Sequence, residues 1–414
     1  AVSGKMVSVT DVETNHSTAL SQEFLFYQSS IGEEVENHGQ SSGAYIFRPA
    51  GEGSITPAAL QTELIVGPLL SEARQVHSDW ASTSHRVWAN GSVVESEWTV
   101  GPIPIDEDVG KEVVSRWTSD INSGDTFWTD ANGREMMERK LNYRPSWNLD
   151  VKEPIAGNFY PVTAAAALRD TAAAAEMFVV TDRAQAAASL ASGHMEFMVH
   201  RRTTKDDGRG VAEALNETTC DCHDCNCPTS TRGLTVRGTH WVGLPSTNAA
   251  RHRRTTQQLA NDPPLLLFLD LLLPEHAAPL LSGTSLLAEG AALPHNVQLL
   301  TLMETEEGGM LLRLAHLYEV GEDGGEAACV DVSALFGGVS SLKELALTGV
   351  PPTNLATRRR WPTGRRPSSL TPTPLPSRLA ECAKGEFSVV LHAMDIRTFE
   401  VELMSDPPRG HSTN

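Results

Sequence analysis

The segment from Met198 to Gly210, "MVHRRTTKDDGRG", gathers three arginines, one lysine, one histidine and two aspartates within thirteen residues. It overlaps the end of the alternating run "HMEFMV", which predicts a strand. Guanidinium groups at the end of a strand offer planar, forked donors that can bind an anion or the hydroxyl groups of a sugar. A salt-bridged turn with a purely structural role is the alternative, because charge clusters often follow strands.

The two carboxylates of this segment, Asp206 and Asp207, could suggest glycoside hydrolysis, which uses a pair of acidic residues on either side of one bond. Adjacent residues of a strand point to opposite faces, however, so these two are not expected to flank a substrate. We expect instead that one of them holds Arg201, Arg202 or Arg209 in a bidentate pair.

Two other patterns contain residues that can bind metals. The cluster "CDCHDCNC", Cys220–Cys227, could bind a soft metal through thiolates, or it could be a disulfide-tied or disordered insertion. His77 and Asp79 form a His-x-Asp pair, but no second pair nearby completes a zinc site. We therefore predict no metal site in this chain. Cys329 and Cys382 are either buried thiols or a disulfide bridge.

The composition argues against two classes of partner. The chain has 414 residues and a formal charge of -19, which repels nucleic acid and anionic membranes. No apolar run reaches the roughly 20 residues of a membrane-spanning helix. Three sequons, at Asn15, Asn90 and Asn216, predict N-glycosylation and are compatible with passage through a secretory lumen.

Short apolar or alternating runs, separated by turn residues, favour large antiparallel β-sandwiches. The runs are "EFLFYQSS", "GAYIFRPA", "SVVESEWTV", "MEFMVH", "LTVRGTHWV", "VQLLTLM", "MLLRLAHLYEV" and "FSVVLHAMDIRTFEVEL". The alanine-rich segment from Thr163 to Ser192 has mixed signals for helix and strand. The segment from Ala250 to Ala260 predicts a short surface helix, and the Pro-rich segment from Pro351 to Pro376 predicts an exposed loop.

An ordered series of motifs resembles the C-terminal β region of glycoside hydrolase family 38 α-mannosidases, with the lysosomal branch the most similar. The motifs are "SGAYIFRP", "GPIPI", "GKEVVSR", "TDANGREMMERK", "YRPSW", "EPIAGNFYPV", "TDRAQAAASLASGHMEFMVHRRTTKDDGRG", "VQLLTL", "LLRLAHLYEVGED" and "MDIRTFEVEL". The resemblance covers most of the chain and thins from about Val211 to Pro294 and across Pro351 to Pro376.

The resemblance implies an all-β fold, with a large galactose-mutarotase-like β-sandwich over residues 1–290 and a smaller β-sandwich over 291–414. It also implies a zinc-dependent retaining α-mannosidase that acts on terminal α-mannosides of N-glycans in the lumen of a lysosome or vacuole. Zinc and the nucleophile would belong to an upstream catalytic domain or chain, so we expect this chain alone to be inactive. A homodimer stays open. The alternative is a non-catalytic carbohydrate-binding or assembly module.

Two site features follow from the resemblance. Tyr45 of the "SGAY" motif resembles a tyrosine that approaches bound mannose. One of Arg201 and Arg202 resembles an arginine that reaches the rim of the active site. The resemblance further implies that three charged residues brace this arginine: Asp206, Asp207 and Arg209.

Overall fold

The computed structural model describes residues 4–11, 15–33, 39–55, 61–105, 107–219, 232–246, 249–265, 287–288, 290–306, 308–350 and 387–404. The chain divides into two compact units, Ala1–Pro264 and Leu265–Asn414, and each is described by itself. The predicted boundary near residue 290 stays a prediction, because most residues between 264 and 290 lie outside the described part.

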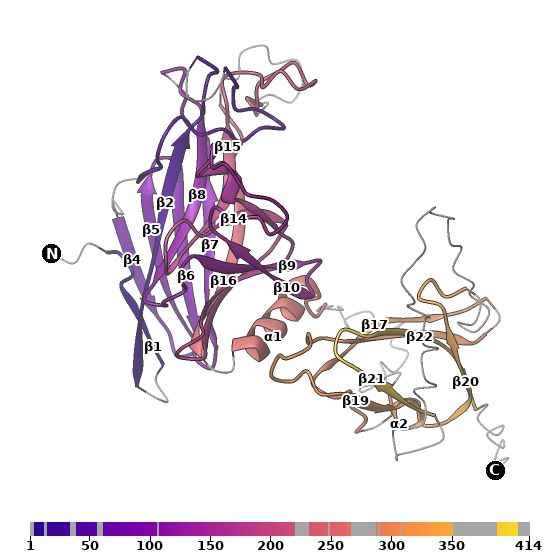
Figure 1. The fold of residues 1–414 in the computed structure, drawn as a ribbon. Helices are drawn as coiled ribbons and strands as arrows, with labels where there is room; N and C mark the ends of the chain where they lie inside the picture. The colour runs from indigo at the N-terminus through magenta and orange to yellow at the C-terminus, as the bar shows by residue number, and fades with distance from the viewer. Residues whose placement is uncertain are drawn as a thin grey trace, which may run out of the picture. The chain divides into compact units, whose positions relative to one another are not determined.

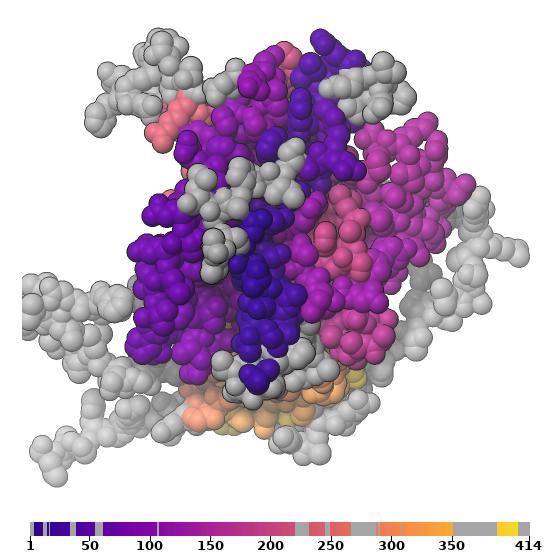
Figure 2. Space-filling model, turned by 90° about the vertical axis from the view of Figure 1, so that its left-hand side faces the viewer, coloured from indigo at the N-terminus to yellow at the C-terminus, as the bar shows by residue number. Residues whose placement is uncertain are grey.

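The first unit contains two antiparallel sheets (Figure 1). The seven-stranded sheet has the order β1-β2-β8-β15-β14-β11, with β3 paired to β2. Its strands are β1 Ser8–Asp11, β2 His16–Gln28, β3 Ser54–Ile55, β8 Lys111–Ser119, β11 Tyr160–Val162, β14 Gln185–Ala188 and β15 His194–Arg202. In Figure 2, the N-terminal strands (indigo) lie at the surface of this unit, between the purple and magenta segments.

The nine-stranded sheet has the order β10-β9-β12-β13-β16-β7-β6-β5-β4. Its strands are β4 Gln61–Val66, β5 Leu70–Ser78, β6 Ala81–Trp88, β7 Val93–Val100, β9 Thr126–Ala131, β10 Glu135–Lys140, β12 Ala165–Asp170, β13 Ala175–Thr181 and β16 Val236–Ser246. The alanine-rich segment, whose signals were mixed, thus supplies strands of both sheets. Tertiary packing overrides its helix propensity, since every residue from Ala165 to Leu168 is fully buried.

The main core lies between the two sheets. It takes Leu20, Trp117 and Phe197 from the seven-stranded sheet and Met177 and Val242 from the nine-stranded sheet. Alternate side chains of each strand point into this layer, as expected for a β-sandwich whose inner faces interdigitate. The predicted all-β class is therefore confirmed.

Helix α1 (Ala249–Asn261) covers part of the outer face of the nine-stranded sheet. The sequence predicted a short surface helix here, and the helix is present. Its side that faces the sheet is buried and hydrogen-bonded. Arg253 is fully buried, and its Nε donates a 2.8 Å hydrogen bond to Glu176 of β13. Arg254 donates to backbone carbonyl groups of residues 133 and 134.

The second unit contains a four-stranded sheet, a two-stranded sheet and one short helix in its described residues. The elements are β17 Val297–Glu304, β18 Met310–His316, β19 Ala328–Asp331, α2 Val332–Phe336, β20 Val339–Leu345, β21 Ser388–Leu391 and β22 Ile396–Leu403. Cys329 on β19 is disulfide-bonded, and Cys382 lies outside the described residues, as does the Pro-rich segment 351–376. None of the helices in the described ranges is long and apolar enough to cross a membrane.

Candidate functional site

One run that was expected to be a strand forms a turn instead. The residues "GAYIFRPA" follow β2 as an irregular loop, and we call residues 42–48 the Tyr45 turn. The loop passes over the outer face of the seven-stranded sheet, where Phe47 packs edge-on against Tyr27 at 5.8 Å and Phe159 at 5.2 Å. This aromatic packing fixes one end of the loop. An apolar residue that suggested a strand, Phe47, therefore anchors a loop to the sheet instead.

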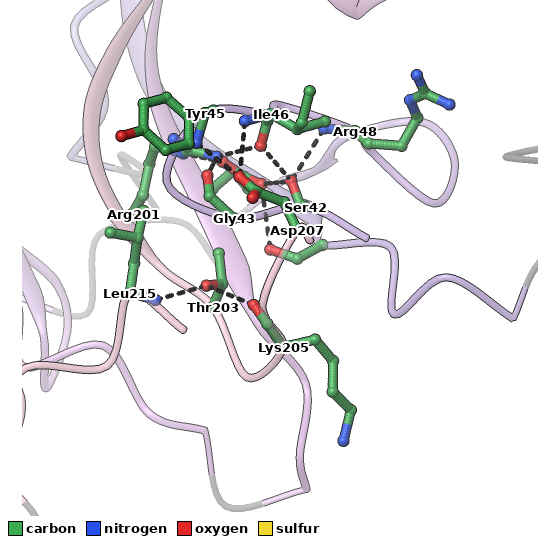
Figure 3. A network of polar contacts seen from close by, with 12 residues as sticks. Ser42, Gly43, Tyr45, Ile46, Arg48, Arg201, Thr203, Lys205, Asp207 and Leu215 are labelled. Atoms are coloured by element: carbon green, nitrogen blue, oxygen red, sulfur yellow. Dashed lines mark hydrogen bonds and ion pairs between the residues drawn. The ribbon is translucent and has the colours of Figure 1, made fainter. Parts of the chain in front are cut away.

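Tyr45 itself points outward. The residue is 68% exposed, although its own amide and that of Ile46 are held by hydrogen bonds (Figure 3). Within the turn, the amide of Gly43 donates to the carbonyl of Ile46 at 2.9 Å. Single exposed aromatic residues are common on protein surfaces, so it is the fixed backbone beneath the ring that sets Tyr45 apart.

Asp207 binds the amide side of the Tyr45 turn. Its Oδ2 accepts from the backbone N–H groups of Tyr45 at 2.6 Å and Ile46 at 3.2 Å, and its Oδ1 accepts from Arg209 N at 3.0 Å. Gly43 makes this approach possible, because a Cβ atom there would lie 2.8 Å from the backbone nitrogen of Asp207. Charge-assisted hydrogen bonds of this kind are about twice as strong as neutral ones.

Arg201 binds the carbonyl side of the same turn. Its Nη2 donates to Gly43 O at 2.9 Å and to Ile46 O at 2.8 Å. Its Nε donates to the carboxylate of Glu112, which lies directly opposite on β8. The two charged residues, Arg201 and Asp207, therefore bind the turn that presents Tyr45 (Figure 3).

Arg202 serves a different part of the molecule. Its side chain is buried, with Nε donating to Asn216 Oδ1 at 2.7 Å and Nη1 donating to Ile103 O at 2.7 Å. Successive residues of a strand point to opposite faces, and this alternation separates Arg202 from Arg201. Of the two candidate arginines, Arg201 is the one that contacts the Tyr45 turn.

The expected bracing of an arginine by the aspartates needs correction. The carboxylate paired with Arg201 is Glu112, whereas Asp207 supports the site through the turn. Strand β15 ends at Arg202, so Asp206 and Asp207 lie in the loop after it, and the alternation of side chains in a strand does not apply to them. Arg209 is exposed and donates to Gln40 Oε1 at 2.7 Å. Asp206 is half-buried.

Glu112 is the residue that the sequence reasoning missed. It is 1% exposed and follows Lys111 at the start of β8. The signal was present in "KEVVSRW", where a carboxylate precedes apolar residues of a buried strand. A buried carboxylate requires hydrogen-bonding partners, so such a position points to an internal polar network.

The remaining candidates lie elsewhere. His77 is buried against Phe24 and bonds Thr83 Oγ1 at 2.9 Å, and burial lowers its pKa to about 4. Asp79 is exposed in the turn after β5, so the pair does not share a site. The cysteine cluster 220–227 lies outside the described residues. Within the ranges that are described, no group of three or more His, Cys, Asp and Glu side chains could hold a metal ion.

The three sequon asparagines, Asn15, Asn90 and Asn216, are all exposed. Asn90 lies in the turn between β6 and β7. Asn216 accepts from Arg202 through Oδ1, which leaves its Nδ2, the atom that carries an N-linked glycan, outside this bond. N-glycosylation at these positions stays a prediction.

Comparison with known families identifies both units. The model described as "Glycosyl hydrolases family 38 C-terminal domain" matches residues 1–209, and the one described as "Glycosyl hydrolases family 38 C-terminal beta sandwich domain" matches residues 296–399. The chain belongs to glycosyl hydrolases family 38. The resemblance inferred from the motifs is confirmed, and the smaller β-sandwich of the second unit has its counterpart in the family.

Relatives from family 38 extend over almost the whole chain. It is 37% identical over 406 residues to the lysosomal alpha-mannosidase of Felis catus and 34% identical over 411 residues to the alpha-mannosidase of Canavalia ensiformis. Each match covers 96% of this chain, but the chain spans only 38% and 40% of those relatives' lengths. An alpha-mannosidase structure from Enterococcus faecalis V583 matches 97% of this chain and 41% of its own, with a TM-score of 0.58 and 10% identity, which supports the fold.

Proposed function

We propose that this chain is the C-terminal portion of an α-mannosidase and that it supplies part of the rim of the substrate site. The enzyme would hydrolyse terminal α-mannosides of N-glycans. The relatives are named alpha-mannosidases, and the matched models are C-terminal domains of a glycosyl hydrolase family. An upstream catalytic part of the same enzyme would be the partner of this chain.

The Tyr45 turn is the observation that carries the proposal. Its tyrosine is exposed, yet its backbone is held by two charged residues, Asp207 and Arg201. Tyrosine offers a sugar both an apolar ring and a hydroxyl group, which suits a ligand with alternating apolar and polar surface. We assign Tyr45 to direct contact with the mannose and Arg201 to holding Tyr45 in place.

The chemistry would proceed by double displacement. In the first step a carboxylate nucleophile would displace the leaving oxygen, which a second carboxylic acid protonates, and form a glycosyl-enzyme. In the second step the second residue, now a base, would activate a water molecule that breaks the glycosyl-enzyme bond and releases the sugar. Both groups, together with the zinc that would bind sugar hydroxyls, are assigned to the upstream part.

The lumen of a lysosome or vacuole is the proposed location. Two observations support it: the first relative is named lysosomal, and Cys329 is disulfide-bonded, as is common in oxidising compartments. The three exposed sequons agree with such a route. A homodimer of the full enzyme stays a proposal.

The test uses two preparations. The 414-residue chain alone should hydrolyse a chromogenic α-mannoside no faster than a buffer blank, whereas the chain produced together with its upstream part should hydrolyse it. Turnover by the chain alone, surviving repurification and chelation, would contradict the assignment of the reacting groups. A chain that binds mannose-containing glycans but gains no activity from any upstream part would establish the alternative, a binding module.

A further inference from the structure

Glu112 lies where three segments of the first unit meet: the end of β2, strand β15 and the Tyr45 turn. It lies near the start of β8, which is hydrogen-bonded to β2 on one side and β15 on the other. In the register of these pairs, Arg201 of β15 and Tyr27 of β2 are its direct cross-strand neighbours. Its position is therefore fixed by a strand inside the sheet, not by a loop.

The carboxylate of Glu112 accepts from side chains of all three segments. Its Oε2 accepts from Arg201 Nε. Its Oε1 accepts from the hydroxyl of Ser42 in the Tyr45 turn and, at 3.3 Å, from that of Ser29 after β2. A buried carboxylate is costly unless it is paired and hydrogen-bonded. The carboxylate therefore holds these donors in place, and the donors in turn hold the carboxylate.

The Tyr45 turn receives this constraint by two routes. One is direct, through Ser42, whose hydroxyl also accepts from Arg48 N at 2.9 Å at the other end of the turn. The other passes through Arg201, which is aligned by Glu112 and donates to the carbonyl groups of Gly43 and Ile46. The two routes hold residues on both sides of Tyr45.

We propose that Glu112 is a positioning residue that sets the place of the Tyr45 side chain through Ser42 and Arg201. This inference rests on the proposed function for its catalytic consequence, but its structural part concerns the turn alone. A carboxylate that served only to stabilise the sandwich would affect folding without acting specifically on the Tyr45 turn.

The experiment compares Glu112→Gln with a matched control, Glu176→Gln. Glu176 is also a buried strand carboxylate that binds two arginines, Arg169 at 2.7 Å and Arg253 at 2.8 Å, but it lies on β13 and contacts α1. Both substitutions replace a buried charge with a neutral amide of the same shape. Only Glu112→Gln should loosen the Tyr45 turn.

The first measurement is amide hydrogen exchange of the peptide that spans residues 42–48, in the full 414-residue chain. The amides of Tyr45 and Ile46 are bonded to Asp207, so their exchange reports opening of the turn. Glu112→Gln should accelerate this exchange by about tenfold or more, and Glu176→Gln should leave it unchanged. Equal exchange in the two variants would overturn the inference, whatever the enzyme does.

The second measurement is kcat/KM of the assembled enzyme on an α-mannoside, with a double-mutant cycle. Glu112→Gln should lower kcat/KM on the order of tenfold in the wild-type background and by less than about twofold when Tyr45→Ala is already present. Equal losses in both backgrounds would overturn a role through Tyr45. Faster exchange in the turn, together with normal kcat/KM for Tyr45→Ala, would refute the proposed contact between Tyr45 and the substrate and leave the positioning of the turn established.

A milder variant tests the same inference if Glu112→Gln fails to fold. Ser42→Ala removes one hydroxyl that bonds the carboxylate and leaves the Arg201 pair in place. It should fold and should accelerate exchange of the turn to a smaller degree. Unchanged exchange in a folded Ser42→Ala chain would contradict the direct route.

Discussion

Replacing Arg201 by lysine keeps the positive charge but removes the forked donor set on which the Tyr45 turn depends. In the structure, Nε faces Glu112 while Nη2 donates to Gly43 O at 2.9 Å and Ile46 O at 2.8 Å. One ammonium group cannot reproduce both arms of a planar guanidinium. We expect the lysine to stay with the carboxylate and to release the two carbonyl groups.

The magnitude follows from the bonds that are lost. One Nη2 group serves both carbonyls, so we count them as a single charge-assisted hydrogen bond, worth about 1.5 to 3 kcal/mol. Each 1.4 kcal/mol corresponds to about a tenfold change in an equilibrium constant, so the displaced population of the turn should rise about ten- to 150-fold. The substitution leaves the sandwich core unchanged, so the free energy of unfolding should fall by less than the free energy of this hydrogen bond.

The assay is steady-state hydrolysis of a chromogenic α-mannoside by the assembled enzyme. Arg201→Lys should lower kcat/KM, by about tenfold where the displaced turn becomes the major form, while the thermal midpoint shifts by only a few degrees. Arg202→Lys, one residue along the same strand, is the control. Wild-type kcat/KM for Arg201→Lys would show that the turn does not need its guanidinium, and the reasoning above would be refuted.

Three further predictions concern the first unit. Arg202→Lys should lower the thermal midpoint and leave kcat/KM nearly unchanged, because Arg202 is buried and bonds Ile103 O and Asn216. A variant with normal stability but no activity would contradict this. Gly43→Ala should displace the Tyr45 turn and lower kcat/KM, since its Cβ would lie 2.8 Å from Asp207 N; unchanged kinetics would contradict the geometry. Burial lowers the pKa of His77 and His85 from 6.5 to about 4, so the unfolded chain binds protons that the folded chain does not. Below about pH 6.5 these histidines should therefore reduce the free energy of unfolding, down to about pH 4. Chemical denaturation at pH 7, 6 and 5 measures this, and assigned imidazole resonances of His77 and His85 that titrate near pH 6.5 in the folded chain would refute it.

The β character of the chain could be predicted from its sequence because alternation of apolar and polar residues directly reflects strands with one buried face. Runs such as "SVVESEWTV" became β7 with one end shifted by a single residue. The alanine-rich segment was ambiguous, because alanine favours helices in isolation but also fits the tightly packed layer around β12 and β13.

The candidate site could be predicted only in part. The motifs pointed to Tyr45 and to one of Arg201 and Arg202, and the structure brings Arg201 to the turn of Tyr45. Their connection through Glu112 was missed, because residues 42, 112 and 201 are brought together by strand pairing that no local pattern reports. The strand predicted for "GAYIFRPA" failed for a related reason: its apolar residues pack outside the sheet, where Phe47 contacts Phe159.

The central claim is that the Tyr45 turn faces the bound mannose of an assembled α-mannosidase. A crystal structure of the full-length enzyme with a mannose-derived inhibitor tests it most directly. The account predicts that the hydroxyl or ring of Tyr45 contacts the sugar, with an O–H···O distance of about 2.5 to 3.0 Å if the hydroxyl is the contacting group. A Tyr45 side chain that remains exposed to solvent, with the inhibitor bound elsewhere, would contradict it.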